Sequence, residues 1–471
     1  MDASHEFAPP ESRRLKIARG LHGTARWILW LIAAGTLGVT PWLLGGNSSA
    51  GYYWTLWLGR LSLLPLVLWL VACALRNKNP GAAFWVPVIC WGLLAAQVIT
   101  STYNRSSAPV APWLGEGFDA IPHNPGRPST AFKQATVLEG WFWLSLGLLA
   151  LTARNVGLSG KQIRSLLWIL AGTTMVLAII GIPFKFSGQM LILGKWTAPE
   201  WYFYSTFLYH NHWCAFTLFG ISAVAALFEN SKNIALRCSL AVAGVVIAAS
   251  APLSTSRLGT LVIGAFGLVV IFVIIRHRRK PTLSRHQPFP VLAVSTLLGT
   301  LAICSVVFYF YKVHGAPGGH RTWSGILKSN PFGIRQTLAE DTIPMVQAKP
   351  WFGWGLGGYG GAFRFYQRAE TRVVHNQGRI TLYDHPHNDW LERLAELGFV
   401  GFGLFLFPGF WWVMLAQRTP ASNLHRWLLV GCVGVLFFAL GDMVFVNRAV
   451  AACFALFFPL ALGPAASPHE E

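Results

Sequence analysis

Apolar stretches long enough to cross a lipid bilayer recur along most of this 471-residue chain, and they restrict the fold more than any other feature. A membrane-spanning helix needs about 20 consecutive apolar residues. Hydrophobic residues make up 54% of the chain and charged residues only 12%, whereas soluble domains carry about 25% charged residues. The mean hydropathy is +0.47. The sequence therefore predicts an all-α polytopic membrane protein in which residues 1–471 form a single integral membrane domain.

The apolar stretches predict about twelve membrane-spanning helices. They fall at about 27–45, 56–75, 83–101, 136–153, 163–183, 206–228, 234–250, 257–275, 290–311, 396–416, 425–442 and 446–463. Cytoplasmic loops of membrane proteins are enriched in Lys and Arg. With a cytoplasmic N-terminus, the cytoplasmic pieces hold nineteen Lys and Arg residues, and the outer pieces, leaving aside residues 312–395, hold eight. This asymmetry predicts that both termini are cytoplasmic.

Residues 312–395 form the longest soluble segment, and loops of this length are usually functional. Apolar residues recur at helical spacing inside it, which predicts an amphipathic helix over about 333–348. We expect Pro344 to bend or interrupt this helix and Pro350 to end it. The glycine-rich run 353–361 lacks a preceding strand and a following Gly-Lys-Ser/Thr. It therefore predicts a tight turn lined with aromatic residues rather than a nucleotide-binding loop.

Titratable side chains crowd together at the end of this loop, just before the tenth predicted span. They are Asp384, His385, His387 and Asp389, with the polar amide of Asn388 among them. Imidazoles and carboxylates at a membrane surface are costly to place without a function, so this stretch indicates chemistry on a lipid-borne substrate. A transition metal is an alternative occupant of the two histidines and two aspartates. Their short, proline-interrupted spacing makes a closed ligand set awkward, and we predict no metal and no other cofactor.

The formal net charge of +19 is spread over many loops rather than gathered in one patch. This distribution argues against a nucleic-acid partner and favours anionic membrane lipids or a phosphate-bearing substrate. The seven cysteines lie in or beside apolar segments without a CxxC pair, so we expect buried thiols and no disulfide framework.

One spacing in the chain is similar to a known signature. The pair His387-Asn388 is followed, after nine residues, by Gly398-x-x-Gly401. This pattern resembles the signature of the O-antigen ligase and O-antigen polymerase superfamily. Twelve spans with one large late periplasmic loop are also typical of that family.

Three further segments resemble motifs of the same family, and the resemblance covers roughly residues 140–460. They are the Ser-Arg motif within Ser-Thr-Ser-Arg-Leu-Gly at 254–259, Arg335 followed by Pro-Trp-Phe-Gly-Trp-Gly at 350–355, and the Asn-His-x-x-Ala motif within 209–215. The resemblance implies a site on the periplasmic face of the bacterial inner membrane.

The resemblance also implies the reaction. A glycan is transferred from a polyprenyl-pyrophosphate carrier to a sugar hydroxyl, either of lipid A-core (ligase) or of another growing chain (O-antigen or exopolysaccharide polymerase), without metal or nucleotide. We prefer ligase slightly because the His-Asn-x9-Gly-x-x-Gly spacing matches well. By resemblance, Arg257, Arg335 and His387 are catalytic. Arginine suits the departing diphosphate because it stays protonated and binds phosphate in a fork. Histidine suits the role of base for the acceptor hydroxyl.

Each of these three residues also has a purely structural alternative. Arg257, at the start of a predicted span, is placed to extend toward lipid head groups. Arg335 is placed to lie on the solvated face of its helix. His387, together with Asn388, is placed to cap the tenth predicted span.

A second set of residues is predicted to bind substrate: His385, Asn388, Asp389, His210, His212 and Arg448. His385 is an alternative base, but we favour a supporting role for it. Asp389 and Glu392 either orient a histidine or cap the following helix, and capping is preferred. His210 and His212 either line the substrate cleft or pack as polar groups. For Arg448, the preferred structural alternative is an ion pair with Asp442.

Two other classes of function compete with glycan transfer. A transporter or flippase of a polyprenyl-linked or anionic solute needs ionisable groups along its path. The middle of each predicted span is nearly free of Asp, Glu, Lys and Arg, whereas polar groups gather at one face. This favours surface chemistry over transport. The same clustering argues against a purely structural subunit.

Overall fold

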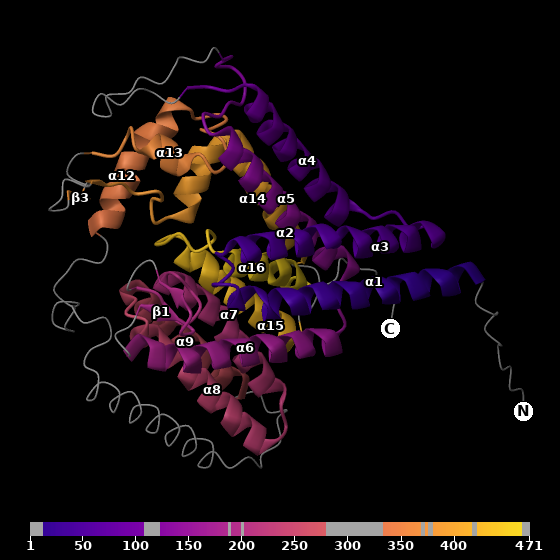
Figure 1. Ribbon diagram of the computed structural model, residues 1–471. Helices are drawn as coiled ribbons and strands as arrows, with labels where there is room; N and C mark the ends of the chain where they lie inside the picture. The colour runs from indigo at the N-terminus through magenta and orange to yellow at the C-terminus, as the bar shows by residue number, and fades with distance from the viewer. Residues whose placement is uncertain are drawn as a thin grey trace, which may run out of the picture.

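The computed structural model describes residues 13–107, 123–186, 190–198, 202–278, 333–368, 373–374, 380–416 and 422–463, and these residues are mostly helical (Figure 1). The helices are α1 (Arg13–Gly38), α2 (Ser49–Leu61), α3 (Leu63–Leu75), α4 (Ala82–Tyr103), α5 (Lys133–Val156), α6 (Gly160–Phe186), α7 (His210–Asn230), α8 (Ile234–Leu253), α9 (Arg257–Arg278), α12 (Gly333–Ala348), α13 (Tyr359–Phe363), α14 (Asp389–Ala416), α15 (Asn423–Phe438) and α16 (Arg448–Ala461). Two antiparallel strand pairs accompany them: β1 (Leu191–Ile192) with β2 (Trp196–Thr197), and β3 (Val373–Val374) with β4 (Ile380–Thr381).

Within the described residues, seven helical segments are long and apolar enough to cross a membrane. They are Ser49–Leu75, which joins α2 and α3, then α4, α5, Gly160–Lys185, α7, α8 and α14. Arg257–Phe272, α15 and α16 are apolar but shorter. The protein is therefore a helical, multi-span membrane protein, while the count of twelve spans stays a prediction.

Two predicted spans differ in their bounds from the helices, and a third lies outside the described residues. Instead of running over 27–45, the first helix ends at Gly38, and a single 3-10 turn over Thr40–Trp42 follows. Helix α14 starts at Asp389, before the tenth predicted span, but its backbone is non-helical at Gly398, close to the predicted start at 396. The predicted span 290–311 and the first part of the predicted loop 312–395 lie outside the described residues.

Helix α7 lies at the centre of the bundle and carries one of the motif segments at its first turn. Its most apolar window is entirely buried, and it packs against α6, α8, α9 and α15. Trp213, Phe216 and Phe219 on this helix belong to the main hydrophobic core. The motif segment at the first turn of α7 therefore belongs to the most enclosed of the candidate spans in the described residues.

The predicted amphipathic helix over 333–348 is confirmed as α12. It continues through Pro344 without interruption, and Pro344 is exposed near the end of the helix. Leu338 and Met345 pack with Trp354 in a small separate core between α12, α13 and α14.

Several helix ends that the sequence assigns to the cytoplasm lie together at one end of the molecule. Arg14 donates to the carbonyl of Ala74, so α1 begins where α3 ends. His22 contacts the carbonyl of Val156 at 3.0 Å, and Leu462 accepts a hydrogen bond from the last turn of α5. Helices α12 and α13 lie at the other end (Figure 1). The molecule therefore has two distinct ends, and α12 and α13 lie at the end away from the start of α1.

Candidate active site

Two glycine turns hold the start of α14 against the loop helices. Helix α14 breaks at Gly398, where φ is 64°, and the turn after α12 has φ of 67° at Gly353. The backbone N–H of Trp354 donates to the carbonyl of Ala395 at 3.1 Å. A Cβ atom on Gly398 would lie 2.4 Å from the backbone of Trp351, so only glycine fits this close approach. The glycines of two motifs therefore form one packed junction.

Asn388 caps the start of α14. Its Oδ1 accepts hydrogen bonds from the backbone N–H groups of Trp390 and Leu391, both at 3.0 Å, and its Nδ2 donates to the carbonyl of Leu440 at 3.0 Å. The cap satisfies N–H groups that a helix otherwise leaves unpaired. His387, just before it, has a φ of 54°, in the left-handed region that few side-chain-bearing residues adopt. Capping therefore belongs to Asn388, and the imidazole of His387 makes other contacts.

Asp442, in the turn between α15 and α16, joins several of these segments. One oxygen of its fully buried carboxylate accepts from Arg335 Nη2 at 2.8 Å, Asn211 Nδ2 at 2.5 Å and the Tyr209 hydroxyl at 3.3 Å. The other oxygen lies 3.4 Å from His387 Nδ1. Burial raises the pKa of the Asp442 carboxyl, but the hydrogen bond and charge of His387 and the Arg335 guanidinium hold that pKa below its ordinary value.

The Ser-Arg motif reaches the same carboxylate through Asn211. Ser256 donates from Oγ to Asn211 Oδ1, while Asn211 Nδ2 binds the carboxylate described above. Arg257 follows as the first residue of α9 and is half-buried. His210 Nδ1 lies 3.1 Å from the carbonyl of Ser254. The predicted motif segments of α7, α9, α12 and the His-Asn loop are therefore brought together.

His212 packs behind the site. Its ring is 3% exposed, and Nε2 lies 3.0 Å from the carbonyl of Met443. The ring also lies edge-on to Tyr209, with centroids 5.0 Å apart. These contacts favour the packed alternative for His212, whereas His210 is only partly buried.

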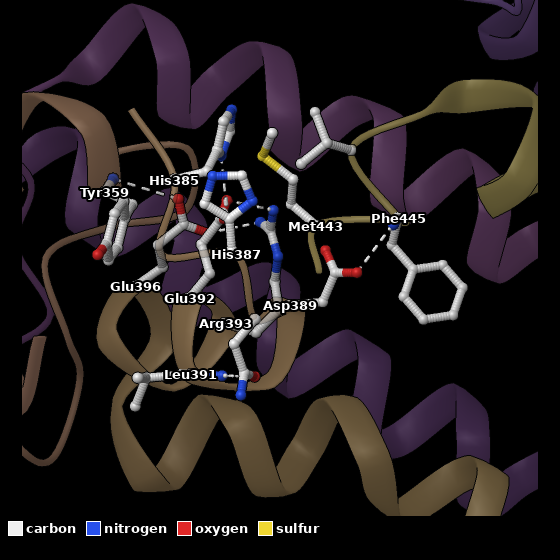
Figure 2. Close-up of polar contacts among 12 residues, drawn as sticks. Tyr359, His385, His387, Asp389, Leu391, Glu392, Arg393, Glu396, Met443 and Phe445 are labelled. Atoms are coloured by element: carbon white, nitrogen blue, oxygen red, sulfur yellow. Dashed lines mark hydrogen bonds and ion pairs between the residues drawn. The ribbon is translucent and has the colours of Figure 1, made fainter. Parts of the chain in front are cut away.

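His385 contacts a second set of buried charges, which Figure 2 shows. Its Nδ1 lies 3.0 Å from Glu392 Oε2, and Arg393 donates to Glu392 at 3.0 Å and to Glu396 at 2.5 Å. Glu396 also accepts from the backbone N–H of Tyr359 at 3.2 Å. Burial lowers the pKa of His385, but the charge and hydrogen bond of Glu392 outweigh it and raise that pKa to about 9.

The preferred prediction that Asp389 and Glu392 cap α14 is wrong. Asp389 is 1% exposed, and its Oδ2 accepts from the backbone N–H of Phe445 at 2.9 Å. Glu392 instead orients His385, which is the alternative stated from the sequence. Both carboxylates are buried, and that of Asp389 contacts the turn between α15 and α16.

The predicted ion pair between Asp442 and Arg448 is also wrong. Arg448 Nη2 lies 3.3 Å from Glu139 Oε1 on α5, and its guanidinium lies over the ring of Tyr52. Asp442 instead pairs with Arg335. Sequence reasoning missed Asp442 as a site residue, although one signal was present. A carboxylate in an outer turn, at the end where predicted phosphate-binding cations gather, is a natural counter-ion.

Cations and imidazoles line the accessible side of the site, and carboxylates lie behind them. The side chains of Arg335, His385 and His387 are 19%, 32% and 16% exposed, whereas those of Asp442 and Glu392 are 0% and 2% exposed. A ligand that approaches from solvent therefore meets the cationic and imidazole groups first.

Within the described residues, no group of three or more His, Cys, Asp or Glu side chains is arranged to hold a metal ion. The four side chains of the metal alternative point to different partners. Asp384 approaches Arg364 at 3.5 Å, whereas His385 contacts Glu392, His387 contacts Asp442 and Asp389 accepts from Phe445. These contacts give no support to a shared metal site, and transfer without metal stays a prediction.

The fold and these contacts define a polytopic membrane protein with a cationic, histidine-containing site at one end of its helical bundle. A family model described as O-antigen ligase matches residues 242–406, a stretch that includes Arg257, Arg335, His387 and the break at Gly398. The resemblance is therefore confirmed, and this region belongs to the O-antigen ligase and polymerase superfamily. No curated protein matches the chain.

Proposed function

We propose that this protein transfers a glycan from a polyprenyl-pyrophosphate carrier to a sugar hydroxyl at the periplasmic face of the bacterial inner membrane. We prefer the O-antigen ligase reaction, in which the acceptor is lipid A-core. The observation that carries the proposal is the meeting of Arg335 and His387 at the buried Asp442, beside the Ser-Arg start of α9. A phosphate-binding cation and an imidazole base are the two groups that glycosyl transfer from a diphosphate requires.

Arg335 and Arg257 would bind the diphosphate. Arg335 donates from Nε to the carbonyl of Gly441 and from Nη2 to Asp442, both at 2.8 Å, and these bonds fix the plane of its guanidinium. Its side chain remains 19% exposed toward the ligand. Arg257 is the first residue of α9, so the positive end of the helix dipole adds to its charge. Fixed cations at this place favour the negative charge that develops on the leaving group.

His387 would act as the base. When Nδ1–H donates to Asp442, the neutral ring keeps a lone pair on Nε2. This nitrogen accepts the proton of the acceptor hydroxyl as the acceptor oxygen bonds to the anomeric carbon. The bond from that carbon to the diphosphate oxygen breaks, and the diphosphate leaves with its electron pair. Protons and charge therefore balance without a metal or a nucleotide.

The location of the site supports an outer-face reaction. The helix ends predicted to be cytoplasmic lie together, and the loop helices lie at the opposite end of the molecule (Figure 1). A lipid-linked donor stays in the membrane while its diphosphate reaches the interface. The site residues lie at helix ends rather than at mid-span, which favours transfer over transport through the protein.

Transfer by the purified full chain tests the proposal. The donor is a defined polyprenyl-pyrophosphate glycan, the acceptors are lipid A-core and a free glycan chain, and the buffer contains a chelator. We expect transfer to lipid A-core and a loss of about 100-fold or more in His387→Ala, since a positioned base contributes about 100- to 10,000-fold. The control is His123→Ala, because His123 is exposed and followed by an asparagine but lacks the Gly-x-x-Gly.

Other outcomes separate the alternatives. Transfer only to the free glycan chain would indicate a polymerase. Movement of the donor across liposomes without any transfer would indicate a transporter. A normal rate in His387→Ala would remove this imidazole from the reaction.

A further inference from the structure

The two imidazoles before α14 are held by different buried carboxylates. Nδ1 of His385 lies 3.0 Å from Glu392, and Nδ1 of His387 lies 3.4 Å from Asp442. The imidazoles are 32% and 16% exposed, and both carboxylates are 2% exposed or less. Since each ring is anchored inward through Nδ1, its Nε2 edge faces the accessible side. One substrate therefore has two Nε2 atoms within the same site to contact.

The two carboxylates differ in how much cationic charge they already have. Asp442 is paired with Arg335, so that pair is neutral without any charge on His387. Around His385, Glu392 and Glu396 share the single guanidinium of Arg393. Both oxygens of Glu396 accept hydrogen bonds from N–H donors.

With both carboxyls ionised, this cluster carries one negative charge more than it has guanidinium groups to balance. A proton on His385 supplies the missing charge. The groups that face His385 are Glu392, Arg393 and Glu396 from α14 and His212 from α7. The negative groups dominate, and the pKa of His385 is raised to about 9.

We propose that His385 is a third phosphate-binding cation, which donates from Nε2 to the departing diphosphate, while His387 alone acts as base. The proposal rests on the proposed function of the site and separates the roles of the two histidines. It follows the general rule that neighbouring titratable groups in unlike environments take unlike roles. His385 keeps its proton throughout, so the proton and electron balance of the transfer is unchanged.

Binding of a short polyprenyl diphosphate, farnesyl pyrophosphate, to the purified full chain in nanodiscs tests this division. Loss of a hydrogen bond from a charged donor weakens binding by about 10- to 100-fold. We expect this loss in His385→Gln, whereas His387→Gln and the control His123→Gln keep nearly the wild-type affinity. Equal binding by His385→Gln and wild type would overturn the proposal. An equal loss in His387→Gln would do so too, because the two roles would then not be separate.

The pH dependence of wild-type binding gives a test that needs no destabilising change. His385 is cationic below its pKa of about 9, so binding should weaken as the pH rises through that value. The probe does not change over this range, because phosphate esters lose their second proton near about pH 6. His385→Arg keeps its charge and should bind equally on both sides of pH 9.

The remaining outcomes are also distinct. Wild-type binding that is flat across pH 9 would overturn the cationic role of His385. The same weakening in His385→Arg would assign the titration to another group and overturn it as well. No binding of the diphosphate by wild type at any pH would instead count against the proposed function itself.

Discussion

At the scale of single residues, Asp442 has the largest expected effect of any group that the substrate does not touch. It is fully buried and fixes both Arg335 and the Nδ1 side of His387. Asp442→Asn removes the negative charge that favours the His387 tautomer with its proton on Nδ1. It also leaves an amide N–H opposite the Arg335 guanidinium. We expect kcat to fall by about 100- to 10,000-fold because the base loses its orientation, and KM for the donor to rise because Arg335 loses its ionic partner. Steady-state transfer kinetics measure both.

A buried aspartate outside the site provides the matched control for that variant. Asp341 on α12 is 2% exposed and is ion-paired with Arg368. Asp341→Asn should lower thermal stability without changing kcat of the folded fraction. If both variants lose activity only in proportion to unfolded protein, Asp442 is structural and its positioning role is refuted.

Arg335→Lys is expected to lose most activity although it keeps the charge. The guanidinium of Arg335 reaches the carbonyl of Gly441 and the carboxylate of Asp442 from two different nitrogens. A lysine has one ammonium and no planar fork, so it cannot make both contacts and still present a donor to phosphate. Arg257→Lys should also lose activity, because a lysine cannot bind the diphosphate with a planar fork of donors. Wild-type turnover in either variant would mean that a surface cation suffices there.

At the scale of elements, the junction of the two glycine turns sets the position of the whole His-Asn loop. Gly398→Ala puts a Cβ where φ is 64° and the backbone of Trp351 lies 2.4 Å away. We expect a loss of stability of about 1–3 kcal/mol or more from backbone strain and displacement of the turn. The matched control is Gly403→Ala on the same helix, since nothing lies within 4 Å of its added Cβ. Thermal midpoints of both variants in detergent measure the difference, and equal midpoints would show that the close approach is not needed.

Elements with a local signal could be predicted, and pairings between distant elements could not. Helix α12 could be predicted because apolar residues recur at helical spacing, although Ile334 and Ile343 are exposed and the buried face is that of Leu338 and Met345. The partner of Asp442 could not be predicted, because Arg448 is its neighbour in sequence and only the packing of α12 on the bundle brings Arg335 to it. Likewise, Asn388 rather than Asp389 caps α14. Both residue types favour caps, and the choice depends on where the α15–α16 turn lies.

At the scale of the whole molecule, composition and charge predicted the class of fold but not every boundary. Seven helical segments meet the length and apolarity of a span in the described residues. The first predicted span runs too far, to residue 45, because Pro41 and the positive-φ glycines Gly45 and Gly46 do not continue a regular helix after Gly38. The family resemblance implied that the site residues share one face, and the contacts of Arg335, His387 and Ser256 bring their elements together.

The orientation of the molecule in the membrane gives the last prediction. Single cysteines replace Arg127 in the loop before α5, Asp384 beside the site, and Lys78 between α3 and α4, all of which are exposed. A membrane-impermeant maleimide should label Arg127→Cys and Asp384→Cys in intact spheroplasts, and Lys78→Cys only after permeabilisation, because Lys and Arg are enriched in cytoplasmic loops. The wild-type chain measures background labelling of the native cysteines, of which Cys90, Cys214, Cys432 and Cys453 are buried and Cys73 and Cys238 are half-buried. Labelling of Asp384→Cys only after permeabilisation would put the site on the cytoplasmic side. A donor presented at the outer face would then never reach it.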